Sequence, residues 1–371
     1  MINLSLSSPP AVRQISGRCV LNGHQVPFVS FSVEDTAYRG ASVFDLTLAI
    51  SALPAEMSLL SWWAKQKVIR TELTVCVGEA SGTRERKLIT GEIDQWHYTP
   101  GRFEITAEGR DLTARLIDAK VTGESFRNMT CSEIATQIAT RRGLIPRVTP
   151  TRHRYGEFYQ IDTAHLTGEQ TEWDILTSLA GFENFIVRIE GEELYFGPAE
   201  QAQSGEDYVI RWQPPGALAY PRCNMSDDLT FSRALTISGG VTVEVLSWNA
   251  KRKNRQFMVT YPQKSHHPSP GGAVTKGKVW RVIRNGLTPE TAQTLARSLY
   301  QQIIQHEMKF TGSVAGDTVL TPHTRVRIEG TNSPFDQHYH CDRVRRTVSC
   351  DTGYIMTLSG RNHSPALEVM P

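Results

Sequence analysis

Hydrophobic and polar residues alternate through the first 120 residues, a pattern typical of β-strands. Three runs carry an apolar side chain at every second position: Phe44, Leu46, Leu48 and Ile50; Leu73, Val75 and Val77; and Phe103, Ile105 and Ala107. Turn residues such as Thr99-Pro100-Gly101 separate the runs. Short strands at this spacing predict a β-barrel or a β-sandwich.

The pattern becomes helical after residue 120. Residues 130–133 read Thr-Cys-Ser-Glu, a capping box in which a hydroxyl and a carboxylate bind free amides at a helix start. Gly143 is expected to end this helix, and a second helix over Glu172 to Ala180 is expected to end at Gly181. The strands FIVRI and ELYF follow, joined by Gly191-Glu192. This section therefore predicts a small α/β unit.

Strand character resumes near Tyr208 and continues through 235–237 and 241–245. One long helix comes next, with Thr288 as its N-cap and Pro289 at the first helical position. The apolar stripe of this helix consists of Ala292, Leu295, Ala296, Leu299 and Ile303. The last section, from 314 to 361, again has the alternation of strands.

The two strand-rich sections resemble one another. The segment from Thr74 to Arg110 aligns with the segment from Arg325 to Arg361 at a constant offset and without a gap. Val75 then faces Val326, Ile93 faces Val344, and both segments close with the pattern T-x-x-G-R. Alternation alone makes any two such segments look alike, but the shared ending and the ungapped register favour an internal duplication.

The expected fold is mainly β with an α+β insertion: two similar β-barrel domains related by duplication, a small α/β unit and one long helix. The first barrel is expected over 1–120 and the α/β insertion over 121–204. The second barrel is expected over 205–250 and 312–365, interrupted at 251–311 by an extended hairpin, a loop and the long helix.

Composition narrows the class of protein. The chain has 371 residues, and its formal net charge of +2 argues against a surface that binds polyanions as a whole. No signal peptide or membrane-spanning segment is evident, so synthesis and folding in the cytoplasm are expected. The six cysteines include no C-x-x-C pair, which favours free thiols, although Cys341 and Cys350 could meet across a hairpin.

A basic run is the most conspicuous charge feature. Lys251, Arg252, Lys253 and Arg255 lie between two runs of alternating apolar residues, which places them at a strand-to-strand connection. A solvated turn or a protein contact is the favoured interpretation. Binding to DNA phosphates is the alternative, since non-specific DNA binding requires several converging cations.

Motifs that carry chemistry are weak or missing. The sequence has no P-loop, nucleophile-elbow or dinucleotide-binding pattern, and HEMKF at His306 lacks the second histidine of a zinc protease. Metal ligation is one interpretation of His266-His267 and of the group His338, His340 and Cys341. Surface or interface positions are the favoured interpretation of both groups. The sequence therefore predicts no catalytic, cofactor-binding or metal-binding residues.

Four segments, in family order, resemble the late-control D proteins, the baseplate hub of contractile phage tails. They are the barrel end and helix from ITAEGRD to TRRGL, the hairpin EVLSWNAKRKNR, the long helix NGLTPETAQTLARSLYQQIIQHEM, and a closing barrel. The closing barrel includes a GT-x-x-x-Phe-Asp-x-x-Tyr element at Gly330 to Tyr339. Related hub domains begin the spike proteins of type VI secretion.

The resemblance implies a homotrimer with two barrels per chain, or six quasi-equivalent units, joining a sixfold tail tube to a threefold spike. The implied partners are a tail tube or tube-initiator protein, baseplate wedge proteins and a spike. Because only ten residues follow Arg361, the spike is expected to be a separate protein. DNA is expected to pass through without specific binding, and the protein is expected in the virion baseplate.

Three other functions stay open at this point. The chain could be a tail-associated enzyme that cleaves peptidoglycan, because sequence distance does not reveal a catalytic carboxylate pair. It could be the hub of a type VI secretion-like injection machine. It could also be a DNA-binding tail component that uses the Lys251–Arg255 run. A structural hub without enzymatic activity is the leading hypothesis.

Overall fold

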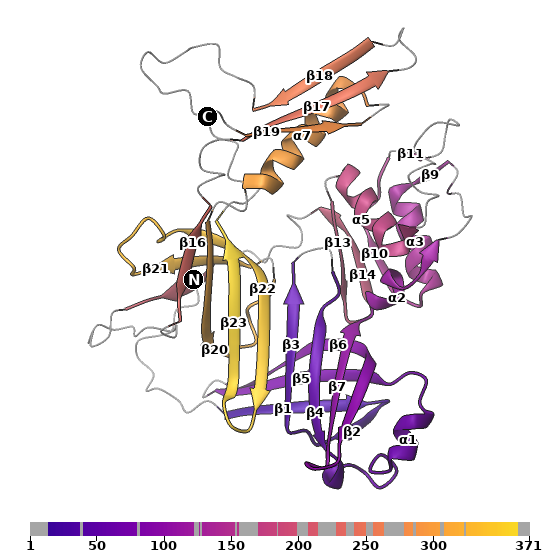
Figure 1. Ribbon diagram of the computed structural model, residues 1–371, viewed down its shortest axis with the longest axis vertical. Helices are drawn as coiled ribbons and strands as arrows, with labels where there is room; N and C mark the ends of the chain where they lie inside the picture. The colour runs from indigo at the N-terminus through magenta and orange to yellow at the C-terminus, as the bar shows by residue number, and fades with distance from the viewer. Residues whose placement is uncertain are drawn as a thin grey trace.

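The structure of this chain is a computed structural model, shown in Figure 1. It describes these residues: 14–37, 40–79, 82–121, 126, 128–152, 154–155, 170–183, 185–198, 207–213, 228–234, 241–249, 255–262, 278–284, 287–304, 308–322 and 324–362. The described part of the chain is mainly β, as the sequence predicts. Its largest feature is a sheet of thirteen strands.

The N-terminal half of this sheet has the strand order β3-β4-β7-β6-β5-β1-β2, and all of its pairings are antiparallel. A 3-10 helix, η1 (Ile50–Ala52), and a short helix, α1 (Leu60–Lys65), follow β4. The strands are β1 (Gln14–Leu21), β2 (His24–Val26), β3 (Ser30–Thr36), β4 (Val43–Ala49), β5 (Arg70–Glu79), β6 (Gly82–Thr99) and β7 (Glu104–Asp111).

Burial confirms most of the predicted strand faces in this half. The alternate apolar residues of β4 and β5 are buried, and Ile105 and Ala107 of β7 are buried with them. The prediction was wrong for Phe103, which is 65% exposed. Phe103 lies in the turn before β7 with a backbone φ of 55°, so it leaves the alternation of the strand.

The C-terminal half of the sheet has the order β16-β20-β23-β22, with β21 also pairing with β22. Among the described strands of this half, only β15 pairs in parallel, with β21. Buried side chains of both halves belong to one hydrophobic cluster. The strands are β15 (Tyr208–Arg211), β16 (Thr230–Arg233), β20 (Met308–Ala315), β21 (Arg325–Glu329), β22 (His338–Ser349) and β23 (Gly353–Arg361).

A small α/β unit follows β7, and its predicted capping box is present. The Thr130 hydroxyl accepts the backbone N–H of Glu133, whose carboxylate accepts the N–H of Thr130. Gly143 follows the helix with a φ of 70°, as predicted, but the second helix runs through Gly181 and ends at Glu183. The predicted stop at Gly181 was wrong, since a glycine lowers helix stability without ending a helix.

Side chains tie the two main helices of this unit together. The Glu172 carboxylate is 1% exposed and accepts a 2.6 Å bond from Arg142 Nε. The elements are α2 (Ala114–Ile117), β8 (Lys120–Val121), β9 (Met129–Thr130), α3 (Cys131–Arg141), β10 (Ile145–Val148), β11 (Arg154–Tyr155), β12 (Gln170–Thr171), α5 (Glu172–Glu183), β13 (Phe185–Glu190) and β14 (Glu193–Pro198).

A third unit lies apart from the large sheet in Figure 1. It consists of β17 (Val241–Asn249), β18 (Arg255–Tyr261), β19 (Lys278–Ile283) and α7 (Pro289–Ile304). The Thr288 hydroxyl accepts the N–H of Thr291, and the apolar stripe of α7 packs on the sheet, as predicted. The predicted boundary at residue 250 grouped β17 with the second barrel, whereas its ladders join it to β18 and β19.

The closing glycines of the predicted repeat meet similar partners. Gly109 lies opposite Ile93 of β6 and Phe44 of β4, and an added Cβ would be 2.5 Å from the Phe44 ring. At Gly360 an added Cβ would be 2.4 Å from the ring of its β20 partner. Its partners in β22 and β20 are Cys341 and Phe310. In both halves, glycine therefore lets an aromatic ring lie against the strand backbone.

The residue after each of these glycines bonds a bulged aspartate. The β6 ladder skips Asp94, and the β22 ladder skips Asp342. Arg110 Nε lies 2.6 Å from Asp94 Oδ2, and Arg361 Nε lies 2.7 Å from Asp342 Oδ2. The same arrangement of bulge, carboxylate and guanidinium thus occurs once in each half.

The ungapped alignment of the repeat does not hold in β6 and β22. It pairs Asp94 with Arg345, three positions beyond the bulged Asp342. The difference arises because the two hairpins differ in length. The ladder between β22 and β23 continues to the pair Ser349 and Gly353, whereas the ladder between β6 and β7 ends earlier, at the pair Thr99 and Glu104, and is closed by a longer turn. The duplication of two barrels itself stays a prediction.

No helix in the described ranges combines the length and the apolar character needed to cross a membrane.

Replacing the N-cap of α3 tests the local structure of the α/β unit. Thr130→Ala removes the side-chain acceptor, and we expect the free energy of unfolding to fall by about 1 kcal/mol. Thr136→Ala is the matched control, because its exposed hydroxyl only donates to the carbonyl of Ser132. Urea unfolding measures both; an equal loss in the two variants would contradict the assignment of Thr130 as the cap.

Candidate functional site

The candidate functional site is the seam at which the two halves of the large sheet join. β3 pairs antiparallel with β22, from Thr36 opposite Arg343 to Ser30 opposite Ser349. On the outer face Arg343 Nε lies 3.2 Å from Glu34 Oε1. Exposed ion pairs of this kind add little stability, so backbone bonds and buried contacts account for most of the seam.

The inner face of the seam contains a buried guanidinium. Arg346 is fully buried, forms an ion pair with Asp35 through Nη1, and donates from Nη2 to the Leu320 carbonyl at 2.7 Å. Arg86 of β6 donates to the same carbonyl at 2.8 Å and to that of Thr318 at 3.0 Å. The loop between β20 and β21 is therefore held by side chains from both halves.

Electrostatics make this cluster sensitive to the loss of its carboxylate. Burial, followed by the positive charge of Arg346, lowers the pKa of Arg86, while Asp35 acts in the opposite direction. The Tyr354 hydroxyl donates to the Asp317 carbonyl at 2.7 Å, and burial raises the pKa of Tyr354 to about 12. The fully buried Arg346 thus depends on one contacting carboxylate, with a second, half-buried guanidinium nearby, which suits a fixed joint between the halves.

Sequence reasoning missed the seam, although a charge signal was present. β3 reads SFSVEDT and β22 contains DRVRR, so acidic residues on one strand face basic residues on the other. Opposite charges on paired strands stabilise the pairing modestly. Two such short runs more than 300 residues apart do not identify each other without the structure.

Two of the predicted histidines gather with charged neighbours. His338 and His340 lie on one side of β22, opposite Arg327 and Arg325 of β21, as their spacing predicts. Asp207 Oδ2 lies 3.5 Å from His338 Nδ1 and also pairs with Arg325. Burial, then the charges of Arg325 and His338, lower the pKa of His340. The surroundings are those of a charge cluster.

Other residues singled out in the sequence lie elsewhere. Asn249 pairs with Arg255 across β17 and β18, which confirms a strand-to-strand connection at the basic run. Lys251, Arg252 and Lys253 lie outside the described residues, as do His266, His267 and His306. Cys341 and Cys350 are free thiols, in agreement with the favoured interpretation. In the described ranges, no three His, Cys, Asp or Glu residues are placed to hold a metal ion.

The Gly330–Tyr339 motif forms a self-bonded loop. The Asp336 carboxylate accepts the backbone N–H groups of Gly330, Thr331 and Asn332 at 3.0–3.2 Å. The buried Tyr339 donates its hydroxyl to the carbonyl of residue 335, a phenylalanine whose ring stacks on that of residue 231. The motif therefore shapes the connection between β21 and β22, and its polar groups are used within the loop.

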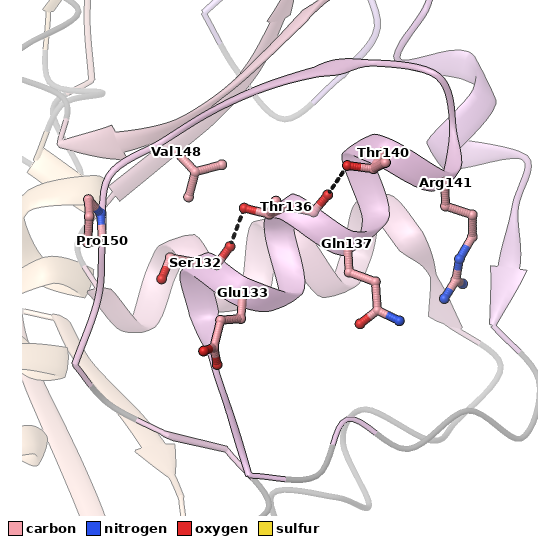
Figure 2. A pocket seen from close by; sticks show the side chains of 8 residues that line it. All are labelled: Ser132, Glu133, Thr136, Gln137, Thr140, Arg141, Val148 and Pro150. Carbon is pink, nitrogen blue, oxygen red and sulfur yellow. Dashed lines mark hydrogen bonds between the residues drawn. The ribbon is translucent and has the colours of Figure 1, made fainter.

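A shallow hollow of about 700 Å³ runs along α3 (Figure 2). The hydroxyls of Thr136 and Thr140 donate to carbonyls one turn earlier, at 2.8 and 2.9 Å. The Glu133 carboxylate belongs to the capping box. Because these groups bond within the helix, and Val148 and Pro150 line the other side, the hollow presents no arrangement typical of catalysis.

Removing the carboxylate of the seam tests its importance. Asp35→Ala leaves Arg346 buried without its counter-ion, and we expect a loss of about 3–5 kcal/mol in unfolding free energy. Arg343→Ala breaks an exposed pair on the same ladder and is expected to cost about 0–1 kcal/mol. Chemical denaturation compares the two; similar small losses would show that the buried pair does not hold the seam.

The histidine cluster predicts a pH dependence. Because the folded pKa of His340 lies below its ordinary value of 6.5, its stabilising contribution is complete above pH 6.5 and is lost as pH falls. We expect His340→Gln to lessen the decline in melting temperature between pH 7.5 and 5.5. His24→Gln, an exposed control on β2, is expected to leave the decline unchanged. Parallel curves for all three proteins would refute this role.

Comparison of the sequence with family models gives no match, and comparison with curated proteins gives none. Solved structures do match. A tail protein of Neisseria meningitidis MC58 aligns with 94% of this chain and 96% of its own, at 15% identity and a TM-score of 0.68. The 43 kDa tail protein of prophage MuSo2 of Shewanella oneidensis aligns with 94% and 98%, at 16% identity and a TM-score of 0.62.

The likeness extends to type VI secretion. The E. coli c3393 protein, a component of that system, aligns with 93% of this chain and 77% of its own, at 11% identity and a TM-score of 0.50. A chain of the Francisella PdpA-VgrG complex aligns at 7% identity and a TM-score of 0.55, and this chain covers 53% of it. The chain therefore has the fold shared by phage tail proteins and type VI secretion components, as the sequence resemblance predicted.

Proposed function

We propose that this chain is the structural hub of a contractile phage tail baseplate, or of a phage-derived tail. The observation that carries the proposal is the alignment over 94% of this chain with nearly the whole of two tail proteins. Fold alone does not establish function. The sheet that runs through both halves of the chain and the buried joint at its seam add support, because a hub transmits force through its own body.

The proposed hub has two barrels per chain and three chains per ring. The paired glycine, bulge and arginine arrangements in the two halves support a duplication. Three chains with two similar units each give six quasi-equivalent units, which adapts a sixfold tube to a threefold spike. Rings of this kind form by head-to-tail contacts between identical chains.

The proposed partners follow from the place of the ring between the tail tube and the spike. A tail tube or tube-initiator protein binds above, a separate spike protein binds below, and wedge proteins surround the ring in the virion baseplate after synthesis in the host cytoplasm. DNA passes through the channel without specific binding. The near balance of 40 basic and 38 acidic residues supports this, because strong DNA binding requires an excess of converging cations.

A second candidate is the hub of a type VI secretion-like injection machine. The similarity in fold to the E. coli and Francisella proteins, with TM-scores of 0.50 and 0.55, supports it. Both candidates share the fold and the mechanical role. They differ in the particle to which the hub belongs: a phage-type tail copurifies with the chain in the first case, and a secretion apparatus does in the second.

The mass in solution tests the hub. A trimer is expected at about 125 kDa, three times the 41.5 kDa of the chain, because closing a ring covers the strand edges. Light scattering across a concentration series measures it. A monomer at every concentration would oppose the trimeric ring.

The peptidoglycan-cleaving alternative is tested with the same preparation on purified cell walls. No clearing is expected, with lysozyme as the positive control. Reproducible clearing that a carboxylate variant abolishes would replace the hub by a tail-associated enzyme.

A further inference from the structure

Several strand edges of the large sheet lack a neighbouring strand in the described part of the chain, and two of them, at β16 and at the end of β6, are related to the seam. β16 is the terminal strand of the sheet and pairs only with β20. The end of β6, from Gln95 to Thr99, pairs with β7, while the ladder between β6 and β5 stops at Glu92. Open edges of this kind pair readily with another strand of suitable register.

These two edges correspond to the two strands that form the seam. β3 pairs with β4, and β16 pairs with β20; in each half, this second strand carries the phenylalanine that packs on the closing glycine. Val33 of β3 lies opposite Phe44, and Phe231 of β16 lies opposite Phe310. β6 and β22 both carry the bulged aspartate. The pairing that joins the halves within one chain therefore has a counterpart, between β16 and the end of β6, that is not formed within the described part of the chain.

We propose that β16 of one copy adds antiparallel to the outer edge of β6 of the next copy and so repeats the seam between chains. This inference rests on the proposed duplication and hub function, and it names the surface and the partner, a second copy of this chain. It makes β16 and the end of β6 the two sides of one head-to-tail interface. Head-to-tail contacts generate a ring when the rotation closes.

The seam also gives the register. In the seam, Arg346 of β22 lies opposite Val33 of β3. Arg346 lies five residues after Cys341, which faces the closing glycine of its half, and Tyr98 lies five residues after Ile93, which faces the closing glycine of the other half. Tyr98 of β6 is therefore the counterpart of Arg346. The counterpart of Val33 is Phe231. The proposed register therefore sets Tyr98 opposite Phe231 and, one position along each strand, His97 opposite Ser232.

Side-chain exposure agrees with this register. Tyr98 and Phe231 are both half-buried and pack against the common hydrophobic cluster, whereas His97 and Ser232 are both exposed. The register thus continues the core across the interface and leaves polar residues outside. A slip by one residue would turn the aromatic rings of one strand away from the core. An aromatic pair directly across two strands adds about 0.2–1 kcal/mol.

The two edges are too far apart to pair within one chain. Six strands lie between β16 and β6 in the sheet order: β20, β23, β22, β3, β4 and β7. At about 4.8 Å per strand, this separates them by roughly 34 Å along the sheet. Figure 1 shows β16 on the left of the sheet and β6 on the right, with β22 and β3 between them. A bond between these strands therefore reports contact between copies.

Disulfide trapping tests the interface. In His97→Cys/Ser232→Cys the two Cα atoms would lie about 4.5–5.5 Å apart, within the range that a disulfide spans. With Cys350→Ser as background, mild oxidation of the full chain is expected to give linked dimers and trimers on a non-reducing gel. Two controls carry a single new cysteine, His97→Cys or Ser232→Cys. A third control combines Ser232→Cys with Glu108→Cys; Glu108 is exposed but belongs to β7, a strand with a neighbour on both sides. These are expected to stay unlinked.

Charge variants give a second readout that does not depend on oxidation. His97→Asp/Ser232→Asp places like charges opposite each other and is expected to shift the mass in solution from trimer towards monomer. His97→Asp/Ser232→Lys is expected to restore the trimer. Both positions are exposed in the single chain, so each variant is expected to keep the melting temperature of the unassociated chain.

The outcomes separate the interface from the hub. Specific linkage that stops at three chains supports both proposals. Specific linkage that continues beyond three supports the strand pairing and overturns the trimeric ring. A trimer by light scattering without specific linkage, or with linkage equal to that of the Glu108 control, overturns the pairing and leaves the hub standing. A monomer without linkage overturns both.

Discussion

The pairing of β3 with β22 is the interaction on which the architecture depends. It joins strands more than 300 residues apart, makes one sheet of two strand-rich sections, and brings their buried side chains into one cluster. The fully buried Arg346 requires Asp35 from the other half, since an unpaired buried cation is costly. Arg86 and Arg346 then hold the Leu320 carbonyl from opposite sides of the seam.

A second constraint shapes each half from within. A glycine opposite a phenylalanine lets the ring pack on the strand, and the following arginine bonds a bulged aspartate on the neighbouring strand. A side chain at Gly109 or Gly360 would collide with the ring and with a backbone carbonyl. The pattern G-R thus reflects a steric and an ionic requirement together, and these two requirements explain its presence in both halves.

The proposed interface between copies extends this logic to the assembly. If the two halves are equivalent, the strands that join them within a chain have equivalents that remain open at its ends. A ring would satisfy those edges with the kind of contact already present at the seam. Mechanical load would then pass from chain to chain through backbone hydrogen bonds, the same bonds that carry it from half to half.

Local signals in the sequence determined the three longer helices, α3, α5 and α7, and most strand faces. The capping box at Thr130, the cap at Thr288, the stripe on α7 and the buried faces of β4 and β5 all depend on residues close together in the chain. Gly181 failed as a helix stop, because its flanking residues sustain the helix through packing of α5 on the unit.

Only the tertiary structure decided which strands pair when they lie far apart in the chain. Ladder hydrogen bonds join backbone groups that are alike in every residue, so β17 gives little sign that it belongs with β19, or β3 that it belongs with β22. The turn after β6 likewise changed the register of the repeat and exposed Phe103. Sequence alternation determined what is buried, whereas pairing and register arise from contacts between distant segments.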